Sequence, residues 1–144
     1  MKDILVDNTV AKNFSNPLDP HYKALIQWLI KTGVLVVTRR LIGEYSSTCA
    51  ASRSDTSMPA LIDHLLREGR LRKVSKQALD GFKFSKKVQS SLRSNKEDHT
   101  TIKAVMLSVR KFALSHDKNL RHDINNFPGY NARAERRPQD LPYA

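Results

Sequence analysis

Short apolar runs alternate with longer amphipathic segments along this chain. Runs at residues 3–7, 34–37 and 111–115 have the length of strands and are flanked by polar residues. Continuous apolar runs of this kind are typical of strands covered on both faces of a parallel sheet. A weaker run at 71–74 predicts a short edge strand.

The segments between these runs carry apolar residues at helical spacing. Asp19 and Pro20 predict the N-cap and first residue of a helix, and Gly33 predicts its end. Further helices are predicted over residues 10–15, from Thr38 to about Ser52, from Pro59 to near Gly69, around 75–92 and over 96–110.

This alternation predicts a three-layer α/β/α fold with a central, mainly parallel sheet of four to five strands. We assign residues 1–127 to the folded domain. Residues 128–144 are rich in Arg and Pro, and this composition predicts an extended C-terminal tail of the disordered type.

The charge balance points to a polyanionic partner. The 144 residues include 25 Lys and Arg against 14 Asp and Glu, a net charge of +11, which favours nucleic acid. The lone cysteine, Cys49, excludes an intrachain disulfide and a thiolate zinc site. We expect a cytoplasmic protein without a membrane partner, because no apolar run reaches transmembrane length and the N-terminus lacks the pattern of a signal peptide.

Positive charge is concentrated in residues 67–93, where cations far outnumber Glu68 and Asp80. We expect this segment to contact a phosphate backbone. Phe82 and Phe84 lie among the lysines; a role in the core is favoured over stacking on bases. The candidate nucleic-acid-binding residues are Arg70, Arg72, Lys73, Lys76, Lys83, Lys86 and Lys87.

Four carboxylates are predicted to meet at one edge of the sheet. Asp7 and Asp117 each follow a predicted strand, and the carboxyl ends of parallel strands share an edge. Glu44 lies in the helix after the middle strand, and Asp98 lies near the start of the helix before the last strand. Carboxylates this close repel one another unless a cation lies between them. Oxygen ligands alone favour Mg²⁺ or Mn²⁺.

Each acid also has a purely structural interpretation. Asp7 could cap the next helix, and Asp117 could form an Asx-type turn. Glu44 could pair with Arg40 four residues earlier. Asp98, like its neighbour Glu97, could favour a helix N-terminus through the dipole.

Three motifs resemble the PIN-domain ribonucleases, the family that includes the VapC-type toxins. Ile4-Leu5-Val6-Asp7-Asn8-Thr9-Val10 resembles the opening strand with the first acid. Thr38-Arg39-Arg40-Leu41-Ile42-Gly43-Glu44 resembles the helix with the second acid, and the segment from Glu97 to Leu120 resembles the closing half. The order Asn8-Thr9 and the presence of Asn119 in place of an acid depart from the family pattern.

The resemblance implies a metal-dependent endoribonuclease that uses Mg²⁺ or Mn²⁺, with RNA as substrate. Its catalytic residues would be Asp7, Glu44, Asp98 and Asp117. Asp7, Asp98 and Asp117 would bind the metal, with Glu97 as an alternative third acid. Thr9, Ser115 and Asn119 would orient ligands or water. The resemblance also implies an antitoxin partner and a homodimer. The main alternative is a non-catalytic nucleic-acid-binding module on the same scaffold.

Overall fold

The computed structural model describes residues 2–14, 18–49 and 57–144. The strands are β1 (Asp3–Val6), β2 (Val34–Val37), β3 (Leu71–Lys73), β4 (Phe112–Leu114) and β5 (Arg133–Glu135). The helices are α1 (Asn8–Ala11), α2 (Pro20–Lys31), α3 (Arg39–Cys49), α4 (Met58–Arg67), α5 (Lys76–Gly81), α6 (Lys86–Ser91), α7 (His99–Leu107) and α8 (Lys118–Asn125), with 3-10 helices η1 (Lys96–Asp98) and η2 (Pro138–Asp140).

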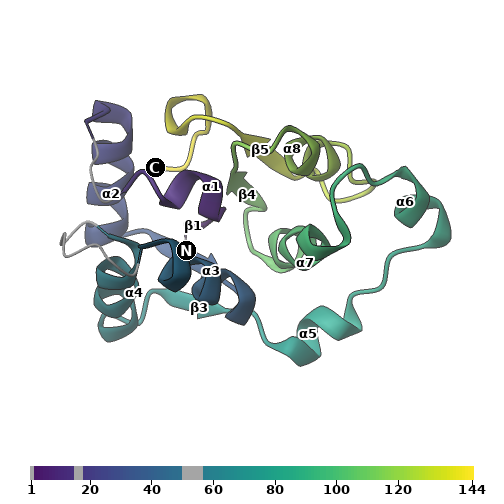
Figure 1. Ribbon diagram of the computed structural model, residues 1–144, viewed down its shortest axis with the longest axis horizontal. Helices are drawn as coiled ribbons and strands as arrows, with labels where there is room; N and C mark the ends of the chain where they lie inside the picture. Colours follow the sequence, from purple (N-terminus) through teal and green to yellow (C-terminus); the bar gives the residue numbers. More distant parts are fainter. Residues whose placement is uncertain (1, 15–17, 50–56) are drawn as a thin grey trace.

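The five strands form one parallel sheet in the order β3-β2-β1-β4-β5. From β1 the chain moves outward to β3, then returns to the other side of β1 for β4 and β5. Right-handed crossovers in opposite directions place the connecting helices on opposite faces of the sheet. Helices α1–α4 accordingly gather on one side and α7 and α8 on the other (Figure 1). The predicted α/β/α class is confirmed.

Local sequence signals explain where the early helices begin and end. Asp19 caps α2 by accepting a hydrogen bond from the His21 amide at 2.8 Å, and the Thr38 hydroxyl accepts one from the Leu41 amide at 3.0 Å at the start of α3. Gly33 follows α2 because a Cβ there would lie 2.6 Å from the Trp28 ring. The predicted end of the α3 helix near Ser52 lies outside the described residues.

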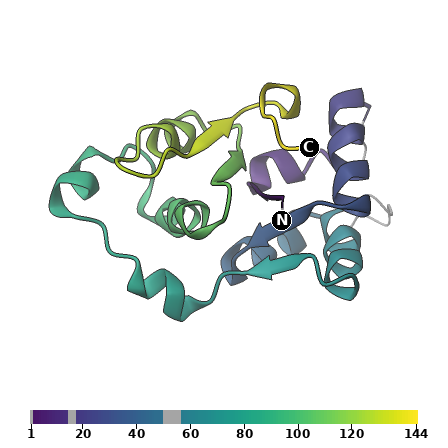
Figure 2. The same cartoon turned by 180° about the vertical axis from the view of Figure 1, so that it is seen from behind.

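The weakly patterned segment at 75–92 forms two short helices, α5 and α6, instead of one. Figure 2 shows this segment as an arm that passes around the outside of α7. Phe82 and Phe84, between the two helices, pack against Phe127 with ring centroids 6.0 and 5.6 Å away. Both rings are half-buried and pack against the core, in line with the favoured structural role, and this packing anchors the arm there.

Residues 128–144 are not an extended tail, and this prediction was wrong. They contain β5, which pairs with β4 along residues Phe112–Leu114. The side chain of Asn125 bonds both the amide and the carbonyl of Ala134, at 2.8 and 3.0 Å. Leu141 is 3% exposed. The domain boundary at residue 127 therefore does not exist in the structure.

No helix in residues 2–14, 18–49 or 57–144 has both the length and the apolar character needed to cross a bilayer.

Candidate functional site

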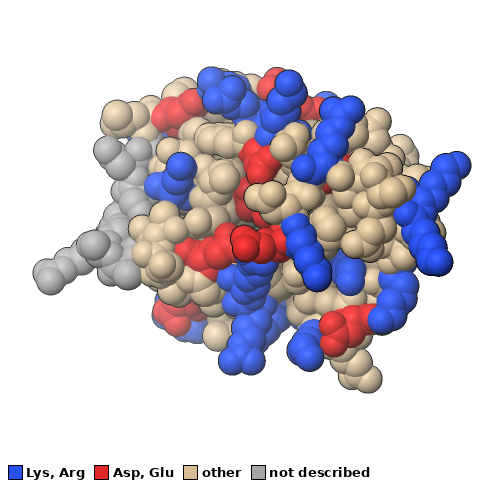
Figure 3. Space-filling model, turned by 45° about the vertical axis from the view of Figure 1, so that its right-hand side comes forward, with Lys and Arg blue, Asp and Glu red and all other residues tan. Residues whose placement is uncertain are grey.

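The sheet reverses its direction of winding between β1 and β4, and Asp7 and Asp117 both follow strands at this point. Open α/β sheets bind ligands outside the carboxyl ends of their strands at such a switch point. Figure 3 shows acidic side chains gathered in the middle of one face, with Lys and Arg side chains on either side.

Asp7 is held in place by two hydroxyl groups. Its Oδ2 accepts hydrogen bonds from Thr9 Oγ1 at 2.7 Å and from Ser115 Oγ at 2.8 Å. Each hydroxyl in turn accepts from a backbone amide, that of His116 at 3.0 Å for Thr9 and that of Asp117 at 3.0 Å for Ser115. These amides orient both hydroxyl protons toward the carboxylate.

Asp7 does not act as a helix cap. The side chain makes no capping bond to α1, although the residue occupies the N-cap position. It is only 7% exposed. Among the described residues, Oδ1 of Asp7 receives no hydrogen bond, so this oxygen is available to a ligand. Thr9 and Ser115 thus both bond the same oxygen of Asp7.

Asp117 has a structural role as well as its place in the acidic site. Its Oδ1 caps α8 by accepting from the amides of Asn119 and Leu120 at 2.9 and 3.2 Å. This bears out the turn interpretation and occupies one of its two oxygens. Asn119 is exposed, and it bonds Asp117 through its backbone amide.

Asp98 is the acid whose pKa responds to the other carboxylates nearby. Burial and the nearby carboxylates of Asp117 and Asp7 raise its pKa to about 6. Glu44 adds to the rise, whereas Arg40 opposes it. Asp7, Glu44 and Asp117, from three other segments, therefore lie within electrostatic reach of Asp98.

Arg40 joins two of the acidic segments, whereas the sequence predicts for it only an ion pair within its own helix. Its Nε lies 3.0 Å from Glu44 Oε1, which bears out that i,i+4 pair. Its Nη1 donates to the Glu97 carbonyl at 2.6 Å, and its Nη2 lies 3.3 Å from Glu97 Oε2. Glu97 is 76% exposed and bound to Arg40, so Asp98 is the better candidate for the third acid.

The donor chemistry of this group fits a hard cation, but a closed ligand cage is not formed. The acids offer only oxygen atoms, and their mutual repulsion is the cost that a divalent ion removes. Across the described ranges, however, no three His, Cys, Asp or Glu side chains are placed to hold one ion. The carboxylates of Asp7, Asp98 and Asp117 would have to rotate or draw together to share a metal.

Two of the predicted nucleic-acid-binding residues instead support the fold. Arg70 donates to the carbonyls of Leu29, Ile30 and Gly33 at 2.5 to 2.7 Å, at the carboxyl end of α2. Arg72 donates to the Leu107 carbonyl at 3.1 Å and lies 3.6 Å from buried Asp3. Their guanidinium groups are engaged with protein atoms, and the sequence could not separate them from the free cations beside them.

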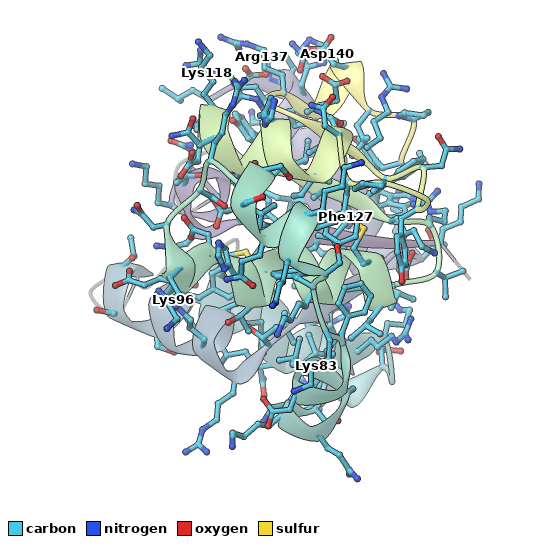
Figure 4. The ribbon with its side chains drawn as sticks, turned by 90° about the vertical axis from the view of Figure 1, so that its right-hand side faces the viewer. Lys83, Lys96, Lys118, Phe127, Arg137 and Asp140 are labelled. Carbon is cyan, nitrogen blue, oxygen red and sulfur yellow. The ribbon has the colours of Figure 1, made fainter. Side chains whose placement is uncertain are left out.

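The predicted lysines divide between two places. Lys73 and Lys76 line a groove of about 850 Å³ at the carboxyl ends of β2 and β3. Lys83, Lys86 and Lys87 are exposed on the arm. Figure 4 places Lys83 at the opposite end of the molecule from Lys118 and Arg137, so exposed cations are spread widely over the surface.

A second basic group lies beside the acids, around His116. The His116 ring lies 3.0 Å from the Tyr22 hydroxyl, and its pKa is lowered by burial and by the charges of four cations. These cations are Arg136, Lys12, Arg121 and Arg137. Only Arg136 and Arg137 stand out in the sequence, as part of the Arg-rich C-terminal segment; no local pattern links them to Lys12 or Arg121.

Comparison of this chain with protein-family models, curated proteins and solved structures gave no match in any of the three. The relationship to PIN-domain ribonucleases is therefore a prediction that rests on the sequence motifs.

Proposed function

We propose that this chain is a metal-dependent endoribonuclease that hydrolyses RNA phosphodiester bonds. The observation that carries the proposal is the placement of Asp7 and Asp117 side by side at the carboxyl edge of the sheet, joined through Ser115. Asp98 lies near enough that its pKa, raised chiefly by burial, also responds to both charges. Carboxylates drawn from distant segments into mutual repulsion cost stability, and such arrangements cluster at functional sites.

Asp7, Asp98 and Asp117 would hold Mg²⁺ or Mn²⁺, with Glu44 more distant. A bound ion of this kind lowers the pKa of a coordinated water and offsets negative charge on a phosphate. Within the chain itself, Thr9 and Ser115 fix the direction of the Asp7 carboxylate. Asn119 is the second residue of α8, just after the Asp117 cap, and there it would orient water or phosphate.

The alternative is a non-catalytic nucleic-acid-binding module, and two observations favour it. No group of three ligands is preformed in the described residues, and one oxygen of Asp117 is committed to capping α8. Such a module would keep the basic surface and bind RNA without any requirement for a metal.

Cleavage of a labelled RNA in the presence of Mg²⁺ or Mn²⁺ tests the proposal. We expect the purified chain to cut the RNA, EDTA to stop the reaction, and Asp7→Asn to abolish it because the amide cannot supply the same charge. Asp63→Asn is the matched control, since Asp63 is exposed and paired with Arg67 on α4. Both variants should be purified identically, so that a contaminating nuclease appears in each.

The results of this assay distinguish the nuclease from the binding module. Cleavage that persists in Asp7→Asn refutes the acidic-site mechanism. RNA binding without cleavage under either metal supports the binding module. Calorimetric titration with Mn²⁺ adds a direct readout, because the ion should bind the unmodified chain and not Asp7→Asn.

The toxin role within a toxin–antitoxin pair, the homodimer and the cytoplasmic location rest on the sequence. An antitoxin for this surface would present acidic residues, since the chain carries a net charge of +11.

A further inference from the structure

The parallel sheet arranges charged residues in a fixed order along its carboxyl edge. Because all five strands point the same way, the residues that follow them share one edge in the order β3, β2, β1, β4, β5. Lys73 ends β3 and Arg39 follows β2, Asp7 and Asp117 follow β1 and β4, and Arg136 follows β5. The edge therefore reads basic, acidic, basic over roughly 19 Å, at about 4.8 Å per strand.

The first basic region is a groove with an apolar floor, which we call the β3 groove. Val74 and Leu79 lie in its floor, and both are at most 9% exposed. Arg39, Lys73 and Lys76 form its rim, and all three are exposed. Its volume of about 850 Å³ lies in the range of pockets that take small organic groups, roughly 300–1,000 Å³. An apolar floor under a cationic rim suits a flat base joined to phosphates.

Arg40 connects the β3 groove with the acids. It lines the groove and also bonds Glu44 and Glu97 beside Asp98. The groove and the acidic segments therefore adjoin at Arg40.

The second basic region lies beyond the acids, next to β4 and β5. The amide of Ser115 donates to the Glu135 carbonyl at 3.1 Å, which sets Arg136 and Arg137 beside the loop that carries Asp117. Arg121 approaches the same loop and donates to the Ser115 carbonyl at 2.9 Å. Arg136 is exposed, and no ion pair to it is found in the described residues.

We propose that one unpaired RNA strand crosses this edge from β3 to β5, with a base in the β3 groove and flanking phosphates on Arg136 and Arg137. The inference rests on the proposed function for the nature of the ligand. A base can enter the groove only when it is free of a pairing partner, so the path selects single-stranded RNA over duplex. The acids meet the middle of the strand, which is the geometry of internal cleavage.

Binding measured without metal tests the path separately from cleavage. Fluorescence anisotropy would follow a labelled single-stranded RNA of about twelve nucleotides with the Asp7→Asn chain in EDTA. The paired changes Lys73→Glu with Lys76→Glu, and Arg136→Glu with Arg137→Glu, each remove two cations from one flank. Lys2→Glu with Lys31→Glu is the matched control, because it makes the same charge change at two exposed residues that precede β1 and β2, on the edge of the sheet opposite the proposed path.

Each flank variant should weaken binding on the order of tenfold and reduce the salt slope by about 0.7 for each lost phosphate contact. The control should lose less than about threefold. A duplex of the same length should bind more weakly than the single strand. An abasic oligonucleotide of the same length should bind more weakly than the RNA. The Lys73 and Lys76 changes should reduce its affinity by a smaller factor than they reduce that of the RNA.

Equal losses in all three variants would overturn the path in favour of diffuse attraction, and so would a duplex that binds as tightly as the single strand. If the expected pattern appears but no metal supports cleavage, the path stands and the nuclease function fails. If RNA is cleaved but the flank variants bind and cut normally, the function stands and the path fails.

Discussion

Asp7 and Ser115 are separated by 108 positions in the sequence but share a hydrogen bond of 2.8 Å. The Ser115 hydroxyl accepts a hydrogen bond from the Asp117 amide and donates one to Asp7. One small side chain thus relates two of the predicted acids to each other. Hydroxyls of this kind set the orientation of a carboxylate ligand, and their loss typically lowers activity or metal affinity by 10- to 100-fold in other proteins.

Ser115→Ala should therefore reduce the cleavage rate by about 10- to 100-fold and raise the Mn²⁺ concentration needed for half-maximal activity. Thr9→Ser is the control, because it keeps the second hydroxyl on Asp7. Initial rates across a Mn²⁺ titration would measure the effect, and a thermal melt would check that the variant is folded. A rate for Ser115→Ala equal to that of the unmodified chain would show that this hydroxyl does not position Asp7.

At the scale of elements, Asp123 fastens the arm to α8. Its carboxylate accepts from the Arg93 amide at 2.9 Å, the Ser94 amide at 2.7 Å and the Ser94 hydroxyl at 2.5 Å. Burial opposes ionisation of Asp123, but the hydrogen bonds from Ser94 and Arg93 outweigh it and lower its pKa. The segment leading into η1, and hence to Asp98, depends on this anchor.

Asp123→Asn should lower the free energy of unfolding by about 2 kcal/mol at neutral pH, because it weakens hydrogen bonds to a charged group. Since the pKa is lower in the folded state, this stabilisation is complete above the ordinary Asp pKa of about 3.9 and is lost as the pH falls through the folded value. Urea unfolding from pH 7 down to pH 3 should show the two curves converging at the acid end.

Asp80→Asn is the control for this change, because Asp80 is 65% exposed and pairs with Lys76 across one helical turn. It should alter stability by less than about 0.5 kcal/mol. A difference between Asp123→Asn and the unmodified chain that stayed constant to pH 3 would count against the ionised anchor.

At the scale of the whole molecule, the C-terminal segment completes the sheet. Leu141 is buried, and the Tyr143 ring lies 5.0 Å from that of Trp28 on α2. Arg110 donates to the Tyr143 carbonyl at 2.6 Å. These contacts bring the end of the chain back to the helices on the first face, so the segment after β5 closes the domain.

Leu141→Ala should lower the free energy of unfolding by about 2–3 kcal/mol through loss of buried apolar contact. Leu18→Ala makes the same chemical change at a side chain that is 83% exposed, and it should cost less than about 0.5 kcal/mol. Denaturant midpoints would measure both. Equal midpoints for the two variants would mean that the C-terminal segment is not packed in solution.

The sequence predicts the central strands and helices well because their apolar runs and capping residues are sufficient to identify them. Residues 34–37 are apolar throughout, and Asp19-Pro20 marks a helix start without tertiary help. It fails at β5, since Arg133-Ala134-Glu135 has no strand pattern and is held by β4 and by Asn125. It also fails to separate Arg70 from Lys73, because only tertiary contacts decide which cation meets carbonyls and which faces solvent.

β1 is the first strand of the chain and also the middle strand of the sheet. Leu5 pairs with Val36 on one side and with Ala113 on the other. During synthesis the second side of β1 lacks its partner until Phe112–Leu114 has been made, and pairing over such separations is slow. The acidic site cannot assemble before then, because Ser115 and Asp117 emerge after β4. We expect a nascent or truncated chain that lacks these residues to show no cleavage activity.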